Sequence, residues 1–170
     1  MKQLLELLAE MINLKLIGNY ALGGATALIR YFEPVQTQDI DVFIVLSNEE
    51  NGLVNLSPIY SFLTLKGIEV KGEYFLVGTT PVQLLVPYNA LIDEAVENAG
   101  VHKFMGCDVR IPSFEHLMAI MVQTGRAKDK ARLSEIFEKT ELFDSTTLNS
   151  ILKTHNLEAK FERVKLWMNG

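Results

Sequence analysis

Residues 20–46 read YALGGATALIRYFEPVQTQDIDVFIVL, and this segment says more about the architecture than any other part of the chain. A short apolar run ends in Gly23-Gly24, and helix-forming residues follow from Ala25 to Phe32 until Pro34 ends the pattern. The next run, 40–46, is rich in β-branched and aromatic residues, which predicts a mostly buried strand. We therefore expect a strand, a glycine turn, a helix and a second strand in this order.

The two aspartates at the start of the second strand are the first candidate for chemistry. Asp39 and Asp41 are two residues apart, so on a strand both side chains face the same way. Two carboxylates on one face repel each other unless a cation lies between them, and their hard oxygens suit Mg²⁺. Gly23-Gly24 before a helix would let backbone N–H groups approach a phosphate. The alternatives are a solvated Asp-x-Asp pair and a tight turn without function.

The composition limits the classes of function. With 170 residues and 19.1 kDa the chain suits one domain, and a net charge of −5 argues against broad, sequence-independent binding to nucleic acid. A single cysteine, Cys107, excludes an intrachain disulfide and fits a reducing cytoplasm. Residues 1–16 are expected to form an amphipathic helix, neither a signal peptide nor a membrane span.

The remainder of the chain predicts an α+β fold with a mixed sheet and a helical C-terminal third. Residues 1–112 are expected to form the α/β core and residues 113–170 a helical region packed on it, as a single compact unit. Ser57 is predicted to cap a helix and Ser113 another. Helices are expected at about 2–15, 57–66, 88–99, 113–123, 127–139, 145–154 and 157–168. Strands are expected at 68–71, 74–77, 82–86, 101–104 and 107–111.

Two parts of the sequence together resemble the polymerase-beta-like nucleotidyltransferase superfamily. Residues 21–28, ALGGATAL, and residues 37–42, TQDIDV, are similar to its Gly-Gly and Thr-x-Asp-Ile-Asp motifs. Residues 111–117 and the turn Gly125-Arg126-Ala127-Lys128-Asp129 resemble further segments of a small bacterial branch that includes the abortive-infection toxin-type transferases. The resemblance covers about residues 16–140 and implies a nucleotidyltransferase-like fold.

The resemblance also implies roles for individual residues. Asp39 and Asp41 would be catalytic residues that bind Mg²⁺ or Mn²⁺, which is the implied cofactor. The residues implied to contact the nucleoside triphosphate are Gly23, Gly24, Thr37, Gln83, Arg126 and Lys128. For Arg126 and Lys128 the alternative is a solvated helix face, because a Lys-Asp pair such as Lys128-Asp129 on a helix is usually solvated.

The sequence departs from the family pattern at three positions. Gln83 stands where the family usually has a third carboxylate, and Val35 and Met121 stand where it often has an arginine and a lysine. An amide oxygen can bind a hard cation, but it cannot accept a proton near neutral pH. Glu69 or Glu73 is a possible substitute for the missing carboxylate.

These observations support three hypotheses. The first is a metal-dependent enzyme that transfers a nucleotidyl group from a nucleoside triphosphate to an unknown acceptor. The second is a catalytically degenerate fold that binds a nucleotide or a partner protein, as in a toxin–antitoxin pair. The third is a structural module.

His102, His116 and His155 lack metal-ligand spacing and are interpreted as surface or satisfied core residues. Trp167, with Leu166 and Phe161, is predicted to seal the last helix onto the body.

Overall fold

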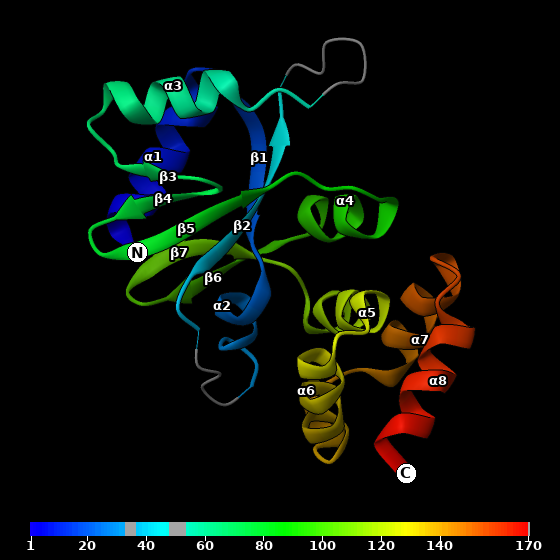
Figure 1. Ribbon diagram of the computed structural model, residues 1–170. Coiled ribbons are helices and arrows are strands. Elements are labelled where there is room, and N and C mark those ends of the chain that lie inside the picture. The colour runs from blue at the N-terminus through cyan, green and yellow to red at the C-terminus, as the bar shows by residue number, and fades with distance from the viewer. Residues whose placement is uncertain (33–36, 48–53, 170) are drawn as a thin grey trace.

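A five-stranded mixed sheet organises the N-terminal two thirds of the chain (Figure 1). The structure, a computed structural model, describes residues 1–32, 37–47 and 54–169, so Val35 lies outside the described residues. In spatial order the strands are β1 (Ile17–Leu22), β2 (Ile40–Leu46), β5 (Thr80–Leu85), β4 (Tyr74–Val77) and β3 (Val70–Lys71). β2 and β5 are parallel, and the other neighbours are antiparallel. This confirms the predicted α+β class with a mixed sheet.

Alternation along β2 directs successive side chains to opposite faces of the sheet. Val42 and Ile44 belong to the main core, which includes buried residues of α1 (Lys2–Asn13) and α3 (Ser57–Leu65). Phe43 belongs to a smaller core that includes buried residues of α4 (Ala90–Glu97). The sheet is therefore covered by α1 and α3 on one face and by α4 on the other. Asp41 is two residues before Phe43 on the same strand, so its side chain also lies on the face that α4 covers.

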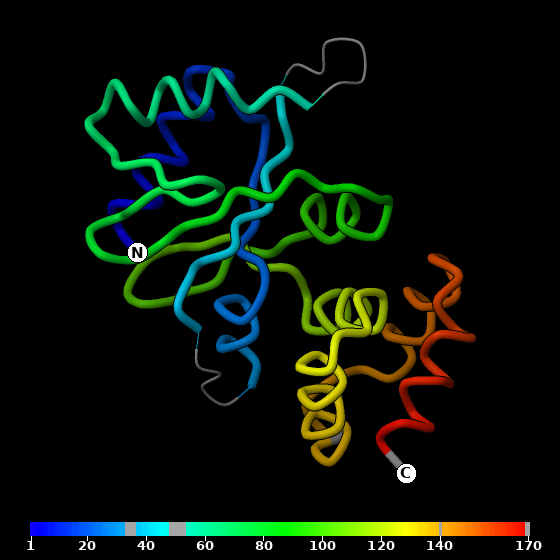
Figure 2. The backbone as a smooth tube through the Cα atoms, in the orientation of Figure 1, coloured from blue at the N-terminus to red at the C-terminus, as the bar shows by residue number. Residues whose placement is uncertain are grey.

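The hairpin of β6 (Gly100–Phe104) and β7 (Cys107–Ile111) lies beside β1 (Figure 2). Arg110 on β7 donates from Nε to the backbone carbonyl of Tyr20 at 3.1 Å. Its Nη2 donates to the carbonyl of Val96 at 3.1 Å, near the end of α4. One guanidinium therefore ties the hairpin to both the sheet edge and a covering helix.

The C-terminal part is helical, with α5 (Phe114–Thr124), α6 (Ala127–Phe137), the 3₁₀ turn η1 (Thr140–Leu142), α7 (Ser145–Thr154) and α8 (Glu158–Asn169). Ser113 caps α5 as predicted, because its hydroxyl accepts from the His116 N–H at 3.2 Å. Gly125 ends α5 with φ +62°, a left-handed conformation that suits glycine. Within the described residues, every helix is too short or too polar to cross a membrane.

Several predicted boundaries were wrong by a few residues. β1 begins at Ile17, before the short apolar run that was expected to form this strand. α2 (Gly24–Leu28) ends before the predicted Phe32. Ser57 is the first residue of α3 and does not cap it, and its N–H is bound instead by the side chain of Asn55 at 3.0 Å. Trp167 is 50% exposed, so it does not seal α8, whereas Phe161 is buried.

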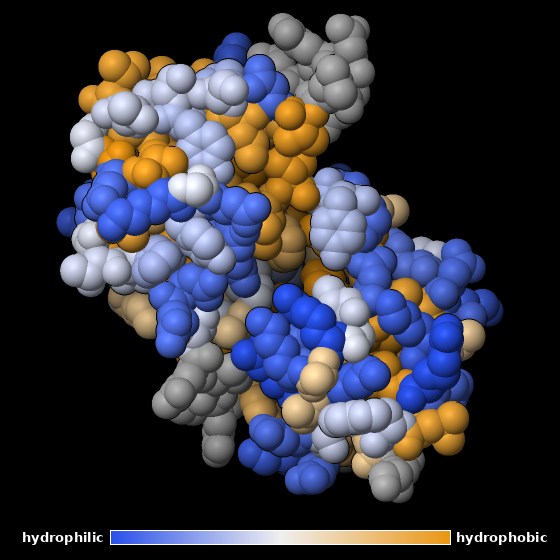
Figure 3. Space-filling view, viewed as in Figure 1, coloured by the Kyte–Doolittle hydropathy of each residue, from blue (hydrophilic) through white to orange (hydrophobic). Residues whose placement is uncertain are grey.

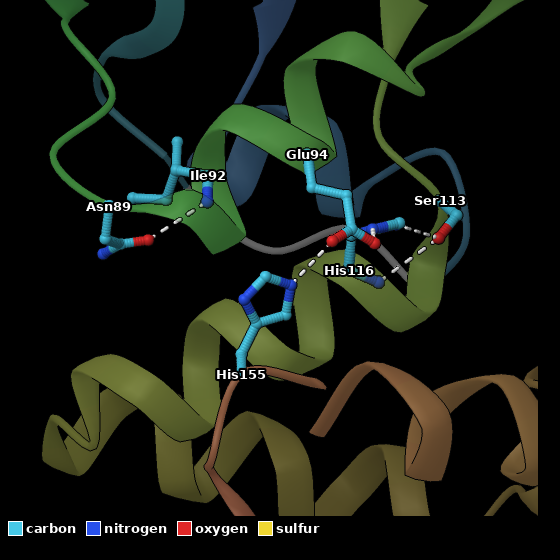
Figure 4. A network of polar contacts seen from close by, with 6 residues as sticks. All are labelled: Asn89, Ile92, Glu94, Ser113, His116 and His155. Carbon is cyan, nitrogen blue, oxygen red and sulfur yellow. Dashed lines mark hydrogen bonds and ion pairs between the residues drawn. The ribbon is translucent and has the colours of Figure 1, made fainter. Parts of the chain in front are cut away.

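Three helical segments meet at Glu94 (Figure 4). Its carboxylate hydrogen-bonds His116 of α5 at 3.2 Å and His155, just after α7, at 2.8 Å. Ser113 lies 2.9 Å from the other ring nitrogen of His116. His116 is buried and fully partnered, as expected, but the sequence did not predict that it shares a carboxylate with His155. This network joins α4 to the C-terminal helices.

Candidate functional site

A polar cleft of about 450 Å³ opens where the start of β2 faces the start of α6. Most of the site residues predicted from the sequence line it, since the structure brings together Gly24, Thr37, Asp39, Asp41, Gln83, Arg126 and Lys128. Ala25, Gln38, Tyr74 and Arg132 complete the lining. Gly23 does not line the cleft. Its N–H donates to the carbonyl of Asp41 at 2.8 Å, so it fixes the turn against β2.

Gly24 allows the turn to lie directly against the Asp41 carboxylate. Its φ is +53°, in the left-handed region that favours glycine. A Cβ atom at this position would lie only 1.9 Å from Oδ2 of Asp41. No other amino acid fits there without moving the carboxylate, so the glycine is needed both for its backbone conformation and for the space it leaves.

The two carboxylates of the site lie in different environments. Asp41 is half-buried on β2, and burial together with the charge of Asp39 raises its pKa, while Lys128 and Arg126 oppose this shift. Asp39 precedes the strand, and the Thr37 hydroxyl lies 3.1 Å from its Oδ1 and 2.8 Å from its backbone oxygen. Two neighbouring carboxylates, one of them desolvated, favour an added cation.

Gln83 lies beside Asp41 on the neighbouring strand. The parallel register of β2 and β5 pairs these two residues, so both side chains extend from the same face of the sheet. The Gln83 amide donates from Nε2 to Oε2 of Glu73 at 3.0 Å, which leaves Oε1 as a neutral oxygen ligand. Glu69 instead pairs with Lys71 at 2.9 Å. Of the two acidic substitutes considered, only Glu73 contacts Gln83.

The donor set fits a cation that the substrate helps to hold. In the part of the chain that the structure describes, no group of three or more His, Cys, Asp or Glu is arranged as a metal site. The protein would thus supply two carboxylates and an amide, and Mg²⁺ commonly uses few protein ligands together with phosphate oxygens and water.

Three cationic side chains face these carboxylates across the cleft. Lys128 and Arg132 are four residues apart on α6 and therefore lie on one side of the helix, and Arg126 immediately precedes it. A hydrogen bond to Asp129 raises the pKa of the Arg126 guanidinium. The cleft therefore has an acidic wall on the sheet and a basic wall on the helical part.

Asp129 holds the basic wall in place. Its side chain is 1% exposed and accepts from Arg126 Nε and from the Thr124 hydroxyl, both at 2.6 Å. Arg132 Nη1 lies 3.9 Å from its other oxygen. The solvated helix face considered for this segment is wrong for Asp129. Lys128 is exposed and lines the cleft.

Sequence reasoning missed Asp129, Arg132 and Tyr74 as site components. The spacing of Arg132 four residues after Lys128 could have shown that both lie on one helix face. Tyr74 could have been found only from the strand register, which pairs it with Gln83 on β4 and β5. The burial of Asp129 depends on the end of α5 and has no local signal.

Two comparisons with known proteins returned nothing: no family model matches this chain, and no curated protein is significantly similar. Solved structures do match. A crystal structure of an antigenic nucleotidyltransferase-like protein from Paracoccidioides brasiliensis superposes with a TM-score of 0.53 at 16% identity, over 99% of this chain and 91% of the other. The fold is nucleotidyltransferase-like. The solution structure of the antibiotic-resistance factor ANT(2'')-Ia is also similar, with a TM-score of 0.44 and 15% identity over 99% and 90% of the two chains.

Proposed function

We propose that this nucleotidyltransferase-like chain is a metal-dependent nucleotidyltransferase that uses a nucleoside triphosphate as donor. The observation that carries the proposal is one cleft with Asp39 and Asp41 on the sheet wall and Arg126, Lys128 and Arg132 on the helical wall. Such a pairing suits a polyanion with bound divalent metal, because the carboxylates would hold the cation and the basic side chains would neutralise the remaining phosphate charge.

The proposed roles follow from the chemistry of each group. Asp39 and Asp41 would hold Mg²⁺ or Mn²⁺, and the bound metal would supply charge neutralisation and polarisation at the reacting phosphate. Gly24 lets the start of α2 lie directly against Asp41, so that the turn and the carboxylate line the same cleft. Arg126, fixed by Asp129, would orient the triphosphate with its two-pronged guanidinium, and Lys128 would add a mobile point charge.

The proton acceptor is the open part of this mechanism. Gln83 cannot take a proton from an acceptor hydroxyl near neutral pH. Glu73 accepts a hydrogen bond from Gln83, which stands where the family has its third acid. We propose Glu73 as the base.

A second candidate function is a nucleotide- or protein-binding module without catalysis, of the toxin–antitoxin type. The specific observation that favours it is the neutral Gln83 directly opposite Asp41 in the strand register. In this case the cleft would bind the metal and triphosphate but would not transfer the nucleotidyl group.

Transfer of label tests the proposal. Each of the four nucleoside triphosphates, labelled at the α-phosphate, is incubated with Mg²⁺, the protein and a cell extract as acceptor source. Formation of a labelled product should require Asp41, so Asp41→Asn should abolish it. The control is Asp93→Asn, which changes an exposed aspartate on α4 outside the cleft and should leave product formation unchanged. Nucleotide binding without any labelled product would favour the binding module.

A further inference from the structure

A second basic pocket lies on the other side of the α5–α6 turn. It has a volume of about 340 Å³ and is lined by Thr124, Gly125, Lys130, Lys160, Arg163 and Val164. Three of these six residues are cationic and none is acidic. The cleft described above shares none of them. This pocket is therefore a separate site, although its Gly125 directly precedes Arg126.

The charge of the chain is distributed unevenly. Residues 1–112 contain seven Lys and Arg against thirteen Asp and Glu, whereas residues 113–170 contain nine against eight. Seven of those nine cations lie in α6 and α8 or, for Arg126, immediately before α6. Figure 3 shows hydrophilic residues over much of this helical region. The net charge of −5 thus comes from residues 1–112, whereas α6, α8 and Arg126 together carry seven cations against four acidic residues. This local excess of positive charge favours an anionic ligand.

The geometry of α6 separates this pocket from the cleft. Lys130 is two residues from both Lys128 and Arg132, which corresponds to about 200° around a helix. It therefore points away from the cleft that those two side chains line. Lys130 is therefore not placed to contact a triphosphate together with Lys128 and Arg132.

The cations of the pocket are partly held in position by the protein. Lys160 donates a hydrogen bond to the backbone carbonyl of Gln123, which holds its ammonium near the end of α5. Lys130 lies 5.7 Å from the ring centre of Trp167 on α8. Arg163 Nε donates to the carbonyl of Ala159, one helical turn earlier, at 3.3 Å. An ammonium has three N–H donors and a guanidinium five, so donors are left for a ligand.

We propose that this pocket binds a phosphate group carried by the acceptor substrate, an inference that rests on the proposed transferase function. An elongated acceptor would place its phosphate among Lys130, Lys160 and Arg163 and extend around the α5–α6 turn toward the cleft. The acceptor is therefore a phosphate-bearing molecule, and the pocket determines which acceptors are used.

Trp167 provides a direct test, since it is the only tryptophan in the chain and its ring contacts Lys130. Inorganic phosphate is titrated at constant ionic strength, with chloride as the balancing anion, and tryptophan fluorescence is recorded. We expect a saturable change. The double variant Lys160→Ala/Arg163→Ala should raise the apparent Kd at least tenfold, while Lys153→Ala/Lys165→Ala, which removes two cations outside the pocket, should not. An unsaturable response, or equal Kd values in both double variants, would overturn the proposal.

Further measurements separate this inference from the proposed function. Saturating inorganic phosphate should leave the affinity for ATP with Mg²⁺ unchanged within twofold, because the pocket and the cleft are distinct. Competition between phosphate and ATP would assign the pocket to the triphosphate and overturn the acceptor role. Label transfer by a protein that binds no phosphate at the pocket would refute this inference alone. Phosphate binding without any label transfer would refute the acceptor role together with the proposed function.

Discussion

Arg126 donates its Nε–H at 2.6 Å to Asp129, a carboxylate that is only 1% exposed, while its own side chain is 57% exposed at the edge of the cleft. This pair connects the packing of the helical part to the basic wall of the site. If the pair is broken, water can take the place of the carboxylate at the exposed Arg126 side chain. Water cannot take the place of the guanidinium at the buried Asp129 carboxylate.

The first prediction follows from this asymmetry. Arg126→Ala leaves the buried Asp129 with Thr124 as its close hydrogen-bond partner, so we expect the free energy of unfolding to fall by about 1–3 kcal/mol. Lys128→Ala, an exposed cation of the same cleft wall, should change it by less than about 0.5 kcal/mol. Urea denaturation measures both. Adding Asp129→Asn to Arg126→Ala should recover part of the loss, and equal losses in the two single variants would argue against the pair.

The second prediction concerns the neutral residue beside Asp41. Gln83→Asp places a third carboxylate near Asp39 and Asp41, so without divalent metal the melting temperature should fall. Addition of Mg²⁺ should raise it more in this variant than in the wild type, because a third charge strengthens the metal site. Thermal denaturation with and without Mg²⁺ makes the comparison. Gln83→Asn, which shortens the side chain equally without a charge, is the control and should show no larger Mg²⁺ response than the wild type.

The third prediction distinguishes the two acidic residues near β4. Glu73 contacts Gln83, whereas Glu69 pairs with Lys71. If Glu73 is the base, Glu73→Gln should lower the rate of label transfer by about a hundredfold or more, because positioned bases contribute about 10²–10⁴ in rate. Glu69→Gln should leave the rate nearly unchanged. Similar rates for both variants would remove Glu73 from the mechanism.

The fourth prediction is a pH dependence that comes from Glu94. Burial raises its pKa, but hydrogen bonds and charges from His155 and His116 outweigh this, so its pKa lies below the ordinary 4.5. A carboxyl group with a lowered pKa stabilises the fold above its unfolded pKa, and this contribution is lost as the pH falls through the folded value. The free energy of unfolding should therefore decrease below about pH 4.5, and less steeply in Glu94→Gln.

The matched control for this prediction is Glu97→Gln, which removes an exposed carboxylate from the same helix. Urea denaturation at a series of pH values should give wild-type pH dependence for this variant. If Glu94→Gln loses stability in parallel with the wild type over the acidic range, the histidine contacts do not contribute in the way described.

Individual strands, helix caps and turns were predictable, because the residues that determine each of them are neighbours in the sequence. Ile40–Leu46 forms β2 with the predicted bounds, since β-branched and aromatic residues fit a buried strand. Ser113 caps α5 as the sequence indicates. The glycine pair was also recognised, although only the structure shows that it is Gly24 that lies against Asp41.

The remaining features depend on contacts between distant segments. Glu94 and His155 are 61 residues apart, and neither has a neighbour in sequence that indicates the other. Asp129 looks like an ordinary charged helix residue until the end of α5 covers it. Trp167 was expected to be buried because tryptophan is large and apolar, but α8 buries Phe161 and leaves Trp167 half exposed. Tertiary packing determined these cases, so no local pattern could predict them.

We propose that Asp39 and Asp41 hold a divalent metal together with a nucleoside triphosphate, and isothermal titration calorimetry with ATP, in the presence and absence of Mg²⁺, measures whether they do. For the wild type and for Asp93→Asn, we expect the affinity for ATP to be at least tenfold higher with Mg²⁺. In Asp41→Asn that gain should disappear. ATP binding of equal affinity with and without Mg²⁺, or a Mg²⁺ gain that survives in Asp41→Asn, would show that the two aspartates do not hold the metal with the nucleotide.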